Sequence, residues 1–356
     1  MSSLTDAPHP WVTILAGGIG SRFWPMSTPA RPKQLLPLAS ERPLIRDTVN
    51  RAARLVPLEQ VRILTGHGLV APFQTALPDL PDSAYMVESR ARGTAPVLAW
   101  AAWAAARIDP ATVIVSLHAD HRVDPEDAFT DLLRDTVALA ARTGDLLTVG
   151  VPPDRAEIGY GYIQPGSEIR TSGDTTARRV VAFHEKPDVE RATQYVRDGY
   201  LWKTGLFVWR ADRFLEEIGR HAPDSAAAVT HLEADDPAAY FDAVPSISVD
   251  HAVLERSDRV AVVDATFDWD DVGSWAALER TLPHDTSENV HMGTAHLVDT
   301  TGSIAATDGD PVVLWGVEDL VVVRASGVTL VMPRDRAPHL KQLLSELPSD
   351  LLTPDP

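Results

Sequence analysis

Short apolar runs alternate with helical patterns over the first 117 residues. Strands separated by helices are typical of a parallel, doubly wound sheet. The sequence therefore predicts an α/β fold with a doubly wound, mostly parallel sheet. Ligands of such sheets bind beyond the carboxyl ends of the strands, so the loops after residues 16, 87 and 117 should share one crevice. The expected strands are 11–16, 61–65, 84–87 and 112–117, and the expected helices are 43–55, 69–77 and 95–107.

The pattern changes twice further along the chain. After about residue 150, glycine-bearing strands mix with a helix at 188–197. From about residue 290, short apolar runs separated by glycines predict a small all-β part, and an amphipathic helix is expected over 337–347. We therefore expect one domain over 1–285, with halves at about 1–150 and 151–285, and a second domain over 286–356. The later strands are expected near 160–163, 178–183, 204–209, 311–315, 320–324 and 328–332.

The composition excludes several functional classes. The chain has no cysteine, which excludes disulfide scaffolds, cysteine-bound metals and thiol nucleophiles. The 32 Lys and Arg residues against 50 Asp and Glu give a net charge of -18, so binding to nucleic acid or to an anionic membrane is not expected. The N-terminus lacks the pattern of a signal peptide. The longest apolar run, between Arg92 and Arg107, is shorter than the roughly 20 residues that span a bilayer. We expect a cytoplasmic protein.

A glycine-rich loop follows the first strand and is free of acidic residues. Residues 7–40 contain no Asp or Glu, although 50 of the 356 residues are acidic, and the cations Arg22, Arg31 and Lys33 lie within this segment. Glycines directly after a strand let backbone N–H groups approach a phosphate. The loop is not a Walker A motif, and Phe23 replaces the third glycine of the dinucleotide pattern. It is read as a polyphosphate cradle, and the alternative is a flexible turn with solvated arginines.

Two acidic clusters are candidate metal ligands. Asp120 follows the apolar strand that ends near residue 117, and Mg²⁺ prefers one or two carboxylates together with substrate phosphates. His118 and His121 allow a rival site for a transition metal, and a helix-capping Asp120 is the other alternative. In FDWDDVGSW, carboxylates stand among large aromatic residues, and one of them could complete the site with Asp120. These carboxylates are Asp268, Asp270 and Asp271.

Three motifs between these clusters combine glycines with aromatic residues. They are GYGYI at 159–163, FHEKPD at 183–188 and LWKTGLFVW at 201–209. Glycine beside an aromatic residue allows close approach to a small polar ligand, and Glu185 with Lys186 can bind a hydroxyl and a phosphate. The alternatives are a surface ion pair at Glu185–Lys186 and core positions for Trp202 and Trp209.

In this order, the motifs resemble those of the sugar nucleotidyltransferases, and within them those of the mannose-1-phosphate guanylyltransferases. The resemblance covers nearly the whole chain. It implies a Rossmann-like nucleotidyltransferase sheet, with a nucleotide half and a sugar half in the larger domain. It also implies a short left-handed β-helix at the C-terminus, used in homodimer contacts. The implied reaction transfers GMP from GTP to mannose 1-phosphate with Mg²⁺, forming GDP-mannose and pyrophosphate.

The resemblance also implies site residues. Arg22, Lys33, Asp120 and Asp271 would be catalytic, and Asp120 and Asp271 would hold the metal. Asp271 rather than Asp270 is in phase with the family's Trp-x-Asp-x-Gly pattern. The sugar phosphate would contact Gly161, Glu185, Lys186, Thr204 and Gly205. Residues 87–96 resemble the guanine-facing stretch. The nucleotide would contact Ala16, Gly17, Gly18, Gly20, Ser21, Arg22, Lys33, Glu88, Arg92, Thr94, Ala95 and Asp120.

Two positions depart from the family pattern. Gly93 and Lys203 each stand where the family usually has asparagine, and they concern the choice of base and of hexose. Three alternatives therefore stay open. They are a sister enzyme that uses another sugar 1-phosphate or nucleotide, a catalytically silent nucleotide-sugar sensor, and a metal-dependent hydrolase that uses His118, Asp120 and His121.

Overall fold

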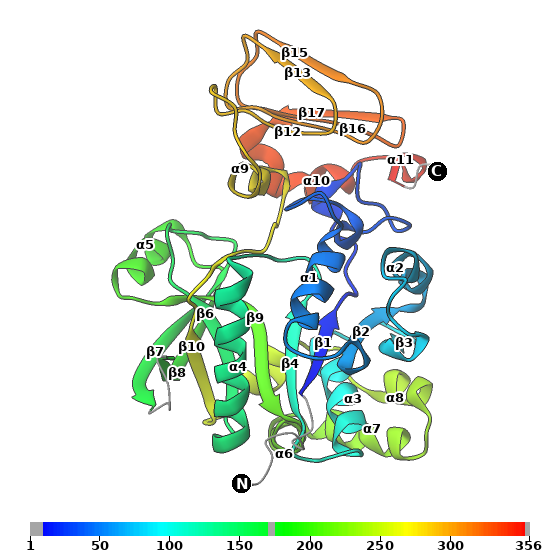
Figure 1. The fold of residues 1–356 in the computed structure, drawn as a ribbon, viewed down its shortest axis with the longest axis vertical. Coiled ribbons are helices and arrows are strands. Elements are labelled where there is room, and N and C mark those ends of the chain that lie inside the picture. The colour runs from blue at the N-terminus through cyan, green and yellow to red at the C-terminus, as the bar shows by residue number, and fades with distance from the viewer. Residues whose placement is uncertain (1–9, 170–174, 353–356) are drawn as a thin grey trace.

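The computed structural model describes residues 10–169 and 175–352. The residues before 10, on which the absence of a signal peptide was predicted, lie outside this part. Within the described residues the main sheet has nine strands in the order β3-β2-β1-β4-β9-β6-β10-β8-β7. Figure 1 shows this sheet below a smaller β region that carries the C-terminus. The strands are β1 Trp11–Leu15, β2 Val61–Gly66, β3 Tyr85–Glu88, β4 Val113–His118, β6 Leu146–Val151, β7 Gly161–Ile169, β8 Ala177–Glu185, β9 Leu201–Arg210 and β10 Val260–Asp264.

The expected mostly parallel α/β sheet is confirmed. The first four strands pair in parallel as β3-β2-β1-β4, and β10 pairs in parallel with β6. The later strands make the sheet mixed, because β9 runs antiparallel to both β4 and β6, and β8 runs antiparallel to β7 and β10. The parallel strands bring the loops after β1, β3 and β4 to one edge, as such topology requires.

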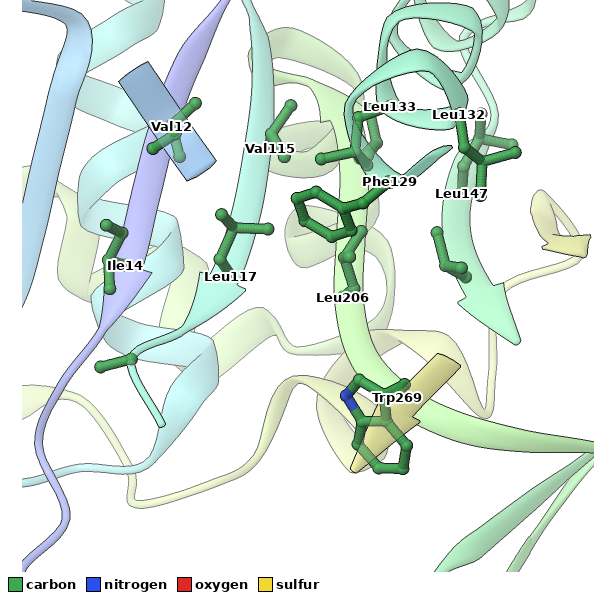
Figure 2. Close-up of a cluster of buried hydrophobic side chains, with 14 of the residues drawn as sticks. Val12, Ile14, Val115, Leu117, Phe129, Leu132, Leu133, Leu147, Leu206 and Trp269 are labelled. Atoms are coloured by element: carbon green, nitrogen blue, oxygen red, sulfur yellow. The ribbon is translucent and has the colours of Figure 1, made fainter. Parts of the chain in front are cut away.

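Helices cover both faces of the main sheet. On one face Val12 and Ile14 of β1 join a buried cluster with Phe129 of α4, which Figure 2 shows. On the other face Trp11 and Leu15 pack in a cluster with α3 and α6. Burial on both faces explains why the strands read as continuous apolar runs. The helices are α1 Leu44–Ala53, α2 Val70–Ala76, α3 Thr94–Ala106, α4 Glu126–Thr143, α5 Val189–Arg197, α6 Ala211–His221, α7 Pro223–Glu233 and α8 Pro237–Ala243.

The C-terminal part is a small β-helix-like stack, as the glycine-separated runs predicted. Strands β12, β14 and β16 pair in parallel, and β13 pairs in parallel with β15. The amphipathic helix expected over 337–347 is not continuous. Pro338 lies in a 3-10 turn over Arg334–His339, and only Leu340–Leu344 forms the helix α10, because proline cannot donate to a helical ladder. The strands are β12 Val290–Met292, β13 Ala295–Val298, β14 Ile304–Thr307, β15 Val312–Trp315, β16 Leu320–Ala325 and β17 Val328–Pro333.

The glycine-rich loop packs its apolar side chains against this C-terminal part. Phe23 and Trp275 are fully buried and contact each other edge to face at 5.0 Å between ring centroids. The Trp275 indole N–H donates to the backbone carbonyl of Trp24 at 3.1 Å. The same core includes Val323 of β16 and Leu340 of α10. The C-terminal part therefore packs against the apolar side of the glycine-rich loop.

The loop after β1 closes on itself at Gly20. This residue has a φ of 72°, and an added Cβ would lie 2.2 Å from the Cβ of Lys33. The Lys33 backbone N–H donates to the carbonyl of Ile19 at 2.9 Å, and the Ser27 hydroxyl donates to that of Gly20 at 2.8 Å. Only glycine combines this left-handed backbone with such close packing.

Among the described helices, none has the length and apolar character that crossing a membrane would need.

We expect Gly20→Ala to lower the free energy of unfolding by about 2 kcal/mol or more, because alanine is strained in the left-handed region and its Cβ overlaps Lys33. The matched control is Gly18→Ala, since nothing lies within 4 Å of a Cβ added there. Urea unfolding should leave this control within about 0.5 kcal/mol of the parent protein. Equal losses in the two variants would contradict the close packing of Gly20 on Lys33.

Candidate active site

Two neighbouring cavities lie at the edge of the sheet where β1 and β4 end. The larger holds about 560 Å³ and is lined by the glycine-rich loop together with Lys33, Asp120 and Lys341. The smaller holds about 220 Å³ and is lined by residues that include Gly161, Lys203, Thr204, Gly205 and Asp250. The two cavities share His118, His121 and Asp271. Two segments far apart in the sequence therefore form the border between the cavities.

Lys33 joins the glycine-rich loop to both acidic clusters. Its ammonium donates to Asp120 Oδ2 at 2.7 Å and to the backbone carbonyl of Asp271 at 2.7 Å. The Lys33 side chain is only 6% exposed. An ammonium has three N–H donors, so one is left for a ligand in the cavity.

Asp120 is held in its charged form. Burial on its own would raise the pKa of Asp120, but the Lys33 ammonium outweighs burial and lowers this pKa to about 2. The carboxylate is partly exposed and lines the larger cavity. It is therefore an anionic oxygen ligand available at neutral pH.

Asp271 lies in the cavity wall, whereas Asp270 holds the turn behind it. The Tyr160 hydroxyl donates to Asp271 Oδ1 at 2.9 Å. Burial raises the pKa of Asp271, and the Asp270 carboxylate raises it further. Asp270 accepts from the Val272 backbone N–H at 2.7 Å and from Arg280 Nε at 2.6 Å. The structure thus brings Asp271, and not Asp270, to the cavity with Asp120.

The donor set suits a hard divalent cation. Asp120 and Asp271 both line the larger cavity. Among the described residues, the Asp271 carboxylate has no ion-pair partner, and its burial disfavours an uncompensated charge. Two carboxylates beside a space for phosphates match the ligands that Mg²⁺ prefers.

The histidines fit a transition metal less well. His118, Asp120 and His121 can place ligand atoms within 4.8 Å of one another. However, the Trp269 indole N–H donates to His121 Nδ1 at 3.0 Å. An indole only donates, so Nδ1 accepts and the neutral ring carries its proton on Nε2. Burial lowers the pKa of both histidines and keeps them neutral. His121 then has no free lone pair for a metal.

The predicted phosphate-binding residues are largely brought together. Arg22 lines the larger cavity, and its guanidinium makes one long hydrogen bond, 3.4 Å, to the carbonyl of Gly273. Arg31 lies apart, because it forms an ion pair with Asp308 at 2.7 Å. Ala16 takes part in the sheet through its backbone, which donates to the carbonyl of Leu64. The other lining residues of the loop are Gly17, Gly18, Ile19, Gly20, Ser21 and Phe23.

The predicted base-facing stretch is only partly at the site. Glu88 is buried beside Gly17, whose added Cβ would lie 3.3 Å from Glu88 Oε1, and burial raises its pKa. Arg92 turns away and donates to the carbonyl of Phe241 at 2.7 Å. Thr94 lines the smaller cavity, and Ala95 is buried in the core below it.

Gly93 marks a close approach of two segments. Its φ is 80°, and an added Cβ would lie 2.6 Å from the carbonyl oxygen of Ile247. The backbone of Ile247 donates to the carbonyl of Arg92 and accepts from the N–H of Ala95. The asparagine expected from the family pattern therefore has no room here.

At the smaller cavity, Lys203 contacts two carboxylates. Its ammonium pairs with Glu185 and lies 3.3 Å from Asp250 Oδ1. Burial lowers the pKa of Lys203, but Asp250 and Glu185 outweigh burial and raise it, so the ammonium stays charged. Lys186 is exposed, and its backbone N–H donates to the carbonyl of Tyr160 at 3.2 Å. Neither Glu185 nor Lys186 lines either cavity, and Glu185 is connected to the smaller one only through its ion pair with Lys203.

Four cavity-lining residues whose side chains can form hydrogen bonds were not among the sequence predictions. Tyr160 belongs to the GYGYI motif and could have been found as a polar aromatic residue among glycines. Trp269 belongs to the second acidic cluster, where only the carboxylates were singled out. Asp250 and Lys341 stand in segments without a recognisable motif, and only the tertiary fold brings them to the cavities.

Two family models match the chain. The model of nucleotidyl transferases matches residues 12–288, and that of the MannoseP isomerase/GMP-like beta-helix domain matches residues 293–347. The chain is 35% identical over 345 residues to a mannose-1-phosphate guanylyltransferase of Escherichia coli, covering 94% of this chain and 73% of that protein. It is 36% identical to one of Klebsiella pneumoniae, with the same coverage.

A solved structure agrees with these matches. The crystal structure described as a mannose-1-phosphate geranyltransferase from Thermus thermophilus superposes with a TM-score of 0.86 at 32% identity. The superposition covers 95% of this chain and 99% of that one. With nearly the whole chain matched in sequence and in fold, this protein belongs to the mannose-1-phosphate guanylyltransferase family of nucleotidyltransferases.

Proposed function

We propose that this protein transfers GMP from GTP to α-D-mannose 1-phosphate, releasing pyrophosphate and forming GDP-mannose. The observation that carries the proposal is the border between the two cavities, where His118, His121 and Asp271 line both. A nucleotide in the larger cavity and a sugar phosphate in the smaller one would meet at this border. The names of the Escherichia coli and Klebsiella pneumoniae relatives support both substrates.

In the proposed reaction, a phosphate oxygen of mannose 1-phosphate attacks the α-phosphorus of GTP. A new P–O bond forms while the bond from the α-phosphorus to the oxygen that bridges to the β-phosphorus breaks. Pyrophosphate leaves with that electron pair. The second pKa of a phosphate monoester is about 6, so the nucleophile is largely ionised at neutral pH. No general base is required, and the protein's task is to align two anions and offset their charge.

The cations of the glycine-rich loop are suited to this task. Lys33 keeps one N–H donor for a phosphate, and Arg22 has donors that the protein leaves largely unused. Buried in position before the reaction, Lys33 needs little reorganisation as charge develops in the transition state. Nucleotidyltransferases of this family typically use a divalent metal. Mg²⁺ held by Asp120 and Asp271 would neutralise phosphate charge at the border.

The smaller cavity is suited to a sugar. Gly161 is hemmed in by Glu185 and Lys203, since its added Cβ would lie 2.9 Å from Glu185 Oε1. Gly205 packs in the same way against His118. These glycines let Lys203 and His118, which line the cavity, pack closely on its backbone wall, so that polar groups border the space for a sugar. As the family resemblance implies, Lys186 would contact the sugar phosphate.

One unpaired acceptor beside the glycine-rich loop, although it lines neither cavity, is compatible with guanine as the base. Glu88 Oε2 is buried and has no hydrogen-bond partner among the described residues. A carboxylate only accepts hydrogen bonds, and guanine presents N–H donors on its base-pairing edge. Gly93 has no side chain that could contact the base, so other groups would have to recognise guanine.

The experiment that tests the function measures pyrophosphate release with Mg²⁺. It combines each of the four NTPs with the 1-phosphates of mannose, glucose, galactose and a heptose, with controls that lack the metal or the sugar. We expect GTP with mannose 1-phosphate to dominate. A dominant signal from another pair would establish the sister-enzyme alternative, and silence for every pair would favour the sensor.

Lys203→Asn tests whether the departure from the family pattern governs hexose choice. Removing the ammonium frees Glu185 and Asp250 to accept hydrogen bonds from sugar hydroxyls. We therefore expect the ratio of kcat/KM for mannose over glucose 1-phosphate to change by about tenfold or more, with KM for GTP nearly unchanged.

The matched control for this change is Lys203→Arg, which keeps the positive charge between the two carboxylates. It should leave the hexose ratio closer to that of the parent protein than Lys203→Asn does. An unchanged ratio in Lys203→Asn would show that Lys203 plays no part in choosing the sugar.

The homodimer and the cytoplasmic location expected from the sequence stay predictions.

A further inference from the structure

Lys341 comes to the nucleotide cavity from the far end of the chain. It follows Leu340, which is buried in the core shared by the glycine-rich loop and the β-helix-like part. Its helix α10 lies against the turn Ser21–Phe23 of that loop, and Figure 1 shows α10 beside the blue N-terminal segment. With Leu340 fixed in the core, Lys341 is exposed and lines the larger cavity.

The charge of Lys341 is not used within the described part of the chain. It has no ion pair or hydrogen bond there, unlike Lys33, which is tied to Asp120 and Asp271. The larger cavity is therefore lined by two lightly engaged cations, Arg22 and Lys341, that face the same space. A triphosphate carries roughly three to four negative charges at neutral pH, so such cations would be stabilising.

The distribution of lysines along the chain also supports a ligand-binding role for Lys341. The chain has four lysines, so 28 of its 32 basic residues are arginines. Three of the four lysines, at 33, 203 and 341, line the two cavities, and the fourth, Lys186, is exposed and lines neither. Among the described arginines only Arg22 lines either cavity. A chain that uses arginine for nearly all its basic residues thus places three of its four lysines, each a compact charge with three donors, in the walls of these cavities.

The position of Lys341 in the cavity indicates which phosphates of the nucleotide it would contact. The reacting α-phosphorus would lie at the border, near the residues that line both cavities. Lys341 lines the nucleotide cavity alone, away from the side where the sugar phosphate enters. In an in-line displacement the leaving group departs opposite the nucleophile. The β- and γ-phosphates would therefore extend toward Lys341.

We infer that Lys341 binds the β- and γ-phosphates of GTP, which leave as pyrophosphate, so that the C-terminal part supplies a substrate-binding residue. This inference rests on the proposed function for the identity of the nucleotide. Lys341 offers an ammonium donor to the phosphates through a charge-assisted hydrogen bond.

The test measures binding by calorimetry with Mg²⁺ present, so that it needs no turnover. Lys341→Met should weaken binding of inorganic pyrophosphate and of GTP by about tenfold or more, because a charge-assisted hydrogen bond is lost. Binding of GMP, which lacks the β- and γ-phosphates, should stay within about twofold for the same reason. Lys341→Arg should retain most of the pyrophosphate affinity, because it keeps the charge.

The matched control is Arg336→Met. It removes one positive charge from the neighbouring exposed turn, and Arg336 does not line the cavity. This variant should bind pyrophosphate as the parent protein does. If Arg336→Met weakened binding as much as Lys341→Met, the effect would be one of overall charge and the inference would be wrong.

Kinetics in the reverse direction give a second readout. Lys341→Met should raise KM for pyrophosphate and leave KM for GDP-mannose nearly unchanged. The inference is overturned if the parent protein does not bind pyrophosphate, if Lys341→Met binds it unchanged, or if GMP binding falls equally. A parent protein that binds pyrophosphate through Lys341 but shows no turnover with any substrate pair would contradict the proposed function alone.

Discussion

Two hydrogen bonds of the Lys33 ammonium fix the geometry on which this site depends. One goes to the Asp120 carboxylate and the other to the backbone carbonyl of Asp271. These bonds join the segment of Lys33 to two others, which lie 87 and 238 positions further along the sequence. Both bonds require Gly20, because any larger residue would push Lys33 away. A nearly buried ammonium also needs these oxygen partners, so the loop, the metal-ligand candidates and the cavity wall depend on one another.

Support for this arrangement comes from the end of the chain. The apolar side of the glycine-rich loop packs in one core with Trp275, β16 and α10. Phosphate-binding loops gain from such support, because catalytic donors act best when they are held in place before the reaction. The same packing brings Lys341 to the wall of the larger cavity. The C-terminal part is therefore more than an appendix to the sheet: it shapes the loop and contributes to the cavity.

Much of the fold and part of the site follow from local sequence. The strand and helix alternation predicted the sheet, and the acid-free loop and Asp120 were found because each directly follows a predicted strand. Asp271 was found differently, through its aromatic neighbours and its phase in the family pattern. Asp250 and Lys341 could not be found in this way, because only long-range packing brings them to the cavities. Arg92 and Arg31 carry the positive charge that a phosphate site needs, but both are bound elsewhere. Arg92 donates to a backbone carbonyl of α8, and Arg31 forms an ion pair with the Asp308 carboxylate.

The central claim is that Lys33 gathers Asp120 and Asp271 into one cation and phosphate site. Its most direct test is the turnover of Asp271→Asn as Mg²⁺ is titrated, compared with Asp268→Asn. Asp268 belongs to the same acidic cluster, but it is exposed on β11 (Asp268–Asp270) and lines neither cavity. We predict that Asp271→Asn lowers kcat by about a hundredfold or more and needs more Mg²⁺, while Asp268→Asn behaves as the parent protein does. Full turnover of Asp271→Asn at the same Mg²⁺ concentration would contradict the account.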